Sequence, residues 1–201
     1  ADGVYSVGVQ SFLRTGWVEE AYASWAAGED IKAVVYASNG VDSVTTKVPS
    51  LFAGSKDVSL ECGNELTVTT NEGGTLYVPN MRSSADAYFK DSERGPNYVK
   101  NVLISVNGGE LKVGTALRAA SAGYWFVMDN WTLSFLGSKP EAYQMVLDNA
   151  LPNALVFGED VVCTEGMVEA YYEAVEGLKT TKVTNHEELS AALTILSGKE
   201  V

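Results

Sequence analysis

The feature that most constrains the fold of this chain is the regular alternation of residues 4–14, VYSVGVQSFLR. One side of an extended chain would carry the apolar residues Tyr5, Val7, Val9 and Leu13. The other side would carry Ser6, Gln10, Phe12 and Arg14. Because successive side chains of a strand point to opposite faces, the pattern predicts a β-strand with one buried face.

Strand patterns continue through the first two thirds of the chain. Further strands are expected at residues 31–37, 75–78, 98–106, 110–117 and 125–135. The turn Asn107-Gly108-Gly109 predicts a hairpin between the two strands that flank it. Two helices are expected among the strands. One lies between Trp17 and Gly28, and the other is capped by Ser83 or Ser84 and carries Ala85, Tyr88 and Phe89.

The periodicity changes after Gly137. Helical spacing begins at Pro140, resumes over about 164–178, and begins again after the cap residues Thr184 and Asn185. Strands first and helices afterwards indicate two units. We therefore predict a mainly β module over residues 1–137 and a short α-helical tail over residues 138–201.

The acidic balance of the chain limits its partners. The sequence has 26 acidic and 14 basic residues and a net charge of −12, so it would repel nucleic acid. The same balance leaves carboxylates free for a hard cation such as calcium. The longest apolar run, residues 123–135, is interrupted by Asp129 and Asn130, so the chain is not expected to span a membrane.

No pattern of a catalytic or zinc site is present. The two cysteines, Cys62 and Cys163, and the single histidine, His186, are too few for a zinc site of the Cys/His type. The cysteines either form a disulfide in an oxidising compartment or remain two buried thiols. No nucleophile or phosphate-binding motif surrounds His186, so an enzyme is not expected.

Four stretches carry a family resemblance. They are DGVYSVGVQSFLR at 2–14, AYASWAAGEDIKAVVYASNG at 21–40, YVPNMRSSADAYFKD at 77–91 and GELKVGTALRAASAGYWFVMDNWTLSFLG at 109–137. In the same order, they resemble the galactose-binding-like jelly-roll modules of exported surface proteins from gut anaerobic bacteria. The first is similar to the family opening G-x-Y-x-V-x-x-Q-x-F-x-R, and the last to the ending W-x-x-x-D-N-[FW]-x-L-x-x-x-G.

The resemblance implies an antiparallel β-sandwich at the cell surface or outside the cell, followed by helices and holding carbohydrate without a required cofactor. Members of the family usually have a further stretch before the G-x-Y strand, whereas this chain starts at Ala1. We therefore expect an exposed strand edge. Another chain or surface-protein domain, the helical tail or a second copy would cover that edge, the chains by strand addition.

Four residues are candidates for contact with a sugar. Gln10 and Arg14 offer the planar donors and acceptors that sugar hydroxyls require. Trp17 at the start of a helix and Tyr124 just outside the last strand are the aromatic side chains expected to be accessible. In the alternative interpretation, the helix over 17–27 covers Phe12, and Arg14 pairs with a neighbouring glutamate.

Asp129 is the candidate metal ligand. Alternation predicts that Asp129 shares a buried face with Trp125, Val127, Trp131, Leu133 and Phe135. A buried carboxylate needs a partner. Asp129 therefore either ligates a structural calcium ion or accepts hydrogen bonds from backbone N–H groups or from an arginine.

The sequence thus favours a non-catalytic glycan-binding module of a surface protein. The alternative is a structural spacer or assembly module that has no sugar site and holds another domain or a partner. A family scaffold does not separate these two functions, because the ligand site lies in the loops.

Overall fold

The computed structural model describes residues 1–157 and 166–198. The strands are β1 (Gly3–Thr15), β2 (Ala33–Ser38), β3 (Ser43–Lys47), β4 (Glu65–Thr69), β5 (Thr75–Pro79), β6 (Val99–Val106), β7 (Lys112–Leu117) and β8 (Tyr124–Gly137). The helices are α1 (Val18–Ala26), α2 (Arg82–Lys90), α3 (Pro140–Ala150), α4 (Met167–Leu178) and α5 (His186–Leu196), with 3-10 turns η1 (Leu51–Gly54), η2 (Gly95–Tyr98) and η3 (Leu151–Asn153). Strand and helix take up similar shares of the chain, 34% and 33%.

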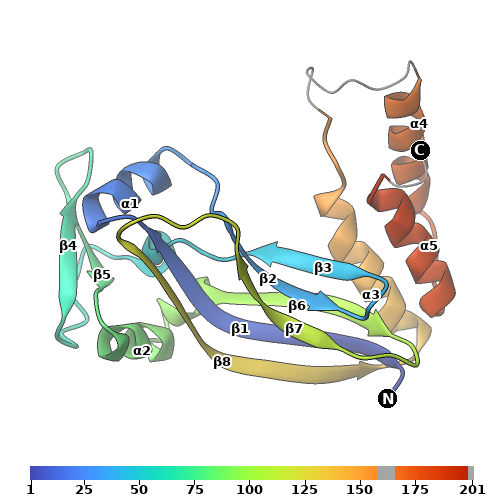
Figure 1. The fold of residues 1–201 in the computed structure, drawn as a ribbon, viewed down its shortest axis with the longest axis horizontal. Helices are drawn as coiled ribbons and strands as arrows, with labels where there is room; N and C mark the ends of the chain where they lie inside the picture. The colour runs from blue at the N-terminus through green and yellow to red at the C-terminus, as the bar shows by residue number, and fades with distance from the viewer. Residues whose placement is uncertain (158–165, 199–201) are drawn as a thin grey trace.

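The described strands form three antiparallel sheets, so the predicted antiparallel character is confirmed (Figure 1). Their strand orders are β6-β1-β8, β3-β2-β7 and β4-β5. The first two sheets pack on each other, because Val9 and Leu13 of β1 share a buried cluster with Ala33 and Val35 of β2. The alternation that was predicted for residues 4–14 therefore places the expected apolar side chains between two sheets.

The opposite face of β1 lies under helices. Phe12 is completely buried in a cluster that takes Val18 and Tyr22 from α1 and Tyr88 and Phe89 from α2. Cys62 packs at the edge of this cluster, and Cys163 lies outside the described residues. The predicted start of α2 is wrong by a few residues. Met81 is the N-cap, and the Ser84 hydroxyl accepts the Met81 N–H from inside the first turn.

The hairpin that was predicted around residues 107–109 is wrong. Strand β6 pairs with β1, and β7 pairs with β2, so the two strands belong to different sheets. The turn carries the chain from one sheet to the other, with Gly108 at a φ of 66°. Its N–H donates to the Asp2 carboxylate at 2.7 Å, which holds the turn against the start of β1.

Helices α3, α4 and α5 form the tail after the predicted boundary, and β8 ends at that boundary (Figure 1). The tail has its own buried cluster, which includes Leu147, Tyr171 and Leu189 and also takes in Val4 of β1. His186 contacts the sheet, because its Nδ1 lies 2.7 Å from the Ser105 hydroxyl. None of the described helices has the length and apolar character that crossing a bilayer requires.

Strand β8 departs from simple alternation. Gly8 of β1 pairs with Thr132 and Gln10 pairs with Asp129, so Val9 stands opposite two residues. This is a β-bulge, and its residue Asn130 has a φ of 54°. The bulge puts Trp125, Val127 and Asp129 on the face that carries Phe12. Leu133 and Phe135 face the other way, with Val7 and Tyr5.

The single buried face that was predicted for 125–135 is therefore wrong, because the extra residue reverses the pleat halfway along the strand. Trp131, Leu133 and Phe135 are 40%, 61% and 51% exposed, so they are not core residues. Trp125 is half-buried.

Candidate functional site

A groove of about 940 Å³ runs between α2 and the first half of β8. One wall is α2 with the residue before it, and the other wall is β8. The residues that line the groove are Met81, Arg82, Ser83, Ala85, Asp86, Phe89, Trp125, Phe126, Val127, Met128 and Asp129. The groove therefore combines apolar and aromatic surface with a few charged groups, which is typical of small-molecule sites.

Buried polar contacts fix α2 in this position. The Tyr88 hydroxyl donates to the Glu65 carboxylate at 2.6 Å, and the Ser59 hydroxyl and the Leu60 N–H donate to the same carboxylate. Burial opposes ionisation of Glu65, but these hydrogen bonds lower its pKa overall. Burial raises the pKa of the Tyr88 hydroxyl most, and its hydrogen bond to the Glu65 carboxylate raises that pKa further. A charge-assisted bond thus ties the buried face of α2 to β4.

Arg14 and Trp17 lie together at one end of the groove, next to Trp125. The guanidinium carbon of Arg14 is 5.5 Å from the centroid of the Trp125 ring and 6.0 Å from that of Trp17. Arg14 also donates to the Gly123 carbonyl and the Asn80 side chain, each at 3.2 Å. Burial lowers the pKa of Arg14. Trp17 is 61% exposed, so the prediction that it is accessible is confirmed.

Gln10 has its hydrogen-bonding groups occupied within the protein. Its amide nitrogen donates to the carbonyls of Phe89 at 2.9 Å and Gly95 at 3.2 Å. Its oxygen accepts from the Asn130 side chain at 2.6 Å. Gln10 therefore joins α2, η2 and the bulge of β8, and it supports the groove instead of presenting free groups to a ligand.

Tyr124 does not join the other candidates. It pairs with Thr15 on the opposite face of β8 from Trp125, where it packs half-buried against the cluster between the two sheets. The structure thus brings together Arg14 and Trp17 and separates them from Tyr124.

Asp129 lies exposed at the rim of the groove, and its carboxylate accepts the N–H of Asn130 at 2.8 Å. The expectation that Asp129 is buried is wrong. Asp129 shares the face of Trp125 and Val127, as predicted, but it lies at the open rim of the groove, where that face is not covered. Within residues 1–157 and 166–198, no three acidic, histidine or cysteine side chains gather closely enough to hold a metal ion. Calcium prefers six to eight oxygen ligands, and Asp129 supplies one carboxylate.

We therefore expect calcium to leave the melting temperature almost unchanged. An ion at a hundredfold excess over its dissociation constant would stabilise the fold by about 2.7 kcal/mol, a rise of about 5–10 °C for a chain of this size. Differential scanning calorimetry in millimolar CaCl₂ and in EDTA measures the difference, with Asp129→Asn as the control. A rise of that size that disappears in Asp129→Asn would make Asp129 a calcium ligand.

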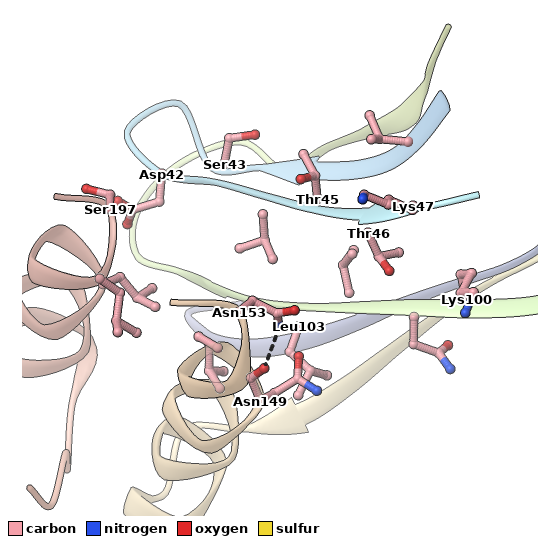
Figure 2. Close-up of a pocket in the computed structure, with 18 of the residues that line it drawn as sticks. Asp42, Ser43, Thr45, Thr46, Lys47, Lys100, Leu103, Asn149, Asn153 and Ser197 are labelled. Atoms are coloured by element: carbon pink, nitrogen blue, oxygen red, sulfur yellow. Dashed lines mark hydrogen bonds between the residues drawn. The ribbon is translucent and has the colours of Figure 1, made fainter. Parts of the chain in front are cut away.

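A second cavity of about 770 Å³ lies between the sheets and the tail. Figure 2 shows that its labelled side chains come from β3 and the residue before it, from β6 and from the helical tail, and are mostly hydroxyl, amide and amine groups. The Asn153 side-chain amide donates to the Asn149 backbone carbonyl at 3.1 Å, a local contact at the end of α3. None of the described residues that line the cavity is aromatic. The α2–β8 groove is therefore the better candidate for a ring-shaped ligand.

Sequence reasoning missed the α2 side of the groove. Arg82 and Asp86 are four residues apart and both line it. In the structure both belong to α2, and this spacing puts them on one helix face. The prediction placed the cap at Ser83 or Ser84, so Arg82 lay outside the predicted helix. The pairing of that face with Trp125 depends on contacts between residues about forty positions apart in the chain, which spacing does not reveal.

Comparisons with protein-family models, with curated proteins and with solved structures find no match to this chain.

Proposed function

We propose that this chain is a non-catalytic, galactose-binding-like sandwich module that binds carbohydrate in the groove between α2 and β8. The observation that carries the proposal is the placement of Trp125 beside Arg82 and Asp86 in one groove. Sugars offer an apolar face of C–H groups that stacks on an aromatic ring, and hydroxyl groups that bond to carboxylates and guanidinium groups.

The charged groups at the groove suit this ligand class. Arg82 is exposed, and no hydrogen bond or ion pair occupies its side chain within the described part of the protein. Asp86 pairs with Lys90 at 2.7 Å along the exposed side of α2. A guanidinium donates to two hydroxyl oxygens at once, and a carboxylate accepts two hydroxyl protons. Trp17 extends the aromatic surface beyond the groove.

The chain would act at the cell surface or outside the cell, as the family resemblance implies. Its partner would be a glycan, with no metal required. An assembly role without a sugar site is the second candidate function, and the exposed second half of β8 favours it.

Glycan-array binding followed by titration calorimetry tests the proposal. We expect at least one glycan class to bind with a dissociation constant in the micromolar to millimolar range. Arg82→Ala and Trp125→Ala should each weaken binding about tenfold, a loss of about 1.4 kcal/mol.

Trp25→Ala is the matched control, because Trp25 stacks on Phe52 outside the groove, with ring centroids 5.5 Å apart. It should bind as the unmodified protein does. Arg82 is exposed, so its variant reports binding even if the loss of Trp125 disturbs the fold. An array without signal, or wild-type affinity in Arg82→Ala and Trp125→Ala, would contradict a sugar site in this groove.

A further inference from the structure

The second half of β8 is an open sheet edge. Among the described strands, β1 is the one neighbour of β8, so the backbone groups on the far side of β8 lack a strand partner. The side chains there are apolar and accessible, with Trp131, Leu133 and Phe135 all at least 40% exposed. An edge of this kind is a template for pairing with another strand.

Between its two irregularities, the edge of β8 lacks the charged and proline residues that usually protect an edge strand. Asp129 is the single charged residue in β8, and residues 130–137 include no lysine, proline or acidic residue. The helical tail packs against the start of β1 through Val4 instead of covering β8. The facing sheet ends at β7, whose Val113 and Leu117 are also exposed, at 43% and 40%. The edge of β8 is therefore uncovered by the described residues.

The regular part of this edge is short and symmetric. One register shift lies at the Asn130 bulge, and a second leaves Leu136 unpaired, because Val4 pairs with Gly137 and Tyr5 with Phe135. The segment between the two shifts is residues 131–135, and Leu133 is its centre. A two-fold axis perpendicular to the sheet preserves the faces of the two strands, so a copy can pair with itself here in register.

The side chains match in that register. Trp131 would stand opposite Phe135 of the second copy, Thr132 opposite Ser134, and Leu133 opposite Leu133. Aromatic pairs and Thr–Ser pairs are among the cross-strand pairs that stabilise antiparallel sheets. The nearest charge, Asp129, would face Gly137, so no like charges meet across the ladder.

We propose that two copies of this chain associate edge to edge through β8, antiparallel about a two-fold axis at Leu133. The pairing joins the two β6-β1-β8 sheets into one continuous sheet. It also buries part of the exposed apolar face of residues 131–135. Each copy carries a net charge of −12, so long-range repulsion opposes association and salt should strengthen it.

Sedimentation equilibrium over about 1–500 µM protein, a range that brackets dissociation constants of weak dimers, tests the proposal. The mass should rise from 21.5 kDa towards twice that value, and further at higher salt. Leu133→Lys should raise the dissociation constant at least about tenfold, since it sets two like charges opposite each other.

Val41→Lys is the matched control, because Val41 is 83% exposed in the turn between β2 and β3. It should associate like the unmodified chain. A chain that stays at 21.5 kDa throughout would overturn the proposal. Equal association of the Leu133→Lys and Val41→Lys variants would overturn it too.

A crosslink fixes the register. In a background with Cys62→Ser and Cys163→Ser, the variant Leu133→Cys places two thiols directly opposite each other, within the Cα separation that a disulfide requires. Mild oxidation should give a covalent dimer from Leu133→Cys and not from Val41→Cys. A monomer after oxidation of Leu133→Cys, in a sample that sediments as a dimer, would show that another surface carries the contact.

Discussion

Replacement of Phe12 by alanine should lower the free energy of unfolding by about 3–5 kcal/mol. Phe12 is fully buried, and its ring centroid lies 5.2–5.7 Å from the rings of Trp125, Tyr98 and Phe89. Alanine would leave a cavity where the sheet, α1 and α2 meet. The loss adds the transfer free energy of the ring to the cost of the cavity, because the surrounding elements relax only in part.

Urea denaturation followed by circular dichroism measures this loss, with Phe135→Ala as the matched control. Phe135 is 51% exposed on β8, so its removal should cost much less. Both variants should be compared at a protein concentration below the range in which the chain associates. Equal losses in the two variants would mean that the helices do not pack on β1 through Phe12.

Gly95→Ala should also destabilise the fold strongly. A Cβ atom at Gly95 would lie 2.3 Å from the Phe89 carbonyl oxygen, closer than non-bonded atoms approach. The carbonyls of Phe89 and Gly95 both accept from the Gln10 amide, so the clash falls on the junction of α2 and η2 with the sheet. Overpacking of buried sites costs about 1–3 kcal/mol and more where backbone must move.

Gly177→Ala is the control for this substitution. Gly177 lies in α4, and a Cβ atom there would have no neighbour within 4 Å. Alanine should stabilise the helix by about 0.5–1 kcal/mol. Because Gly95→Ala moves one wall of the groove, it should also weaken glycan binding, whereas Gly177→Ala should leave binding unchanged. Wild-type stability in Gly95→Ala would show that α2 does not sit tightly against η2.

The sequence predicted the elements whose patterns are local. The alternation of residues 4–14 correctly separated the two faces of β1. The prediction that only one face is buried was wrong, because Phe12 on the second face is packed under α1 and α2. The helices after Gly137 were predicted by caps and spacing, and Asn185 indeed accepts the Glu188 N–H at 3.0 Å. Local signals of this kind depend on neighbouring residues alone.

The errors arose where distant residues decide the structure. The strands that flank residues 107–109 were expected to pair with each other. In the structure, β6 pairs with β1 and β7 pairs with β2. The single face predicted for residues 125–135 failed because alternation assumes an uninterrupted pleat. Asn130 breaks that pleat, and no nearby glycine marks the bulge.

The candidate site was predicted in part. Arg14 and Trp17 lie close together because they are near in sequence. Gln10 looked available, but its partners Phe89 and Gly95 come from far along the chain. Tyr124 and Trp125 are adjacent in sequence and so point to opposite faces, which means that one of them had to leave the site.

The bulge at Asn130 inserts one extra residue into β8 and so shifts the alternation of side chains by one position along the rest of the strand. Upstream of the bulge, Trp125, Val127 and Asp129 point to the face that carries α2. Downstream, Leu133 and Phe135 point to the opposite face of the sheet. Deletion of Asn130 would leave one residue, Trp131, opposite Val9 and would make the pleat regular. Leu133 and Phe135 would keep their pairing with Val7 and Tyr5, on the face that they already occupy. A single extra residue therefore lets alternate residues of one strand face α2 in its first half and the opposite side of the sheet in its second half.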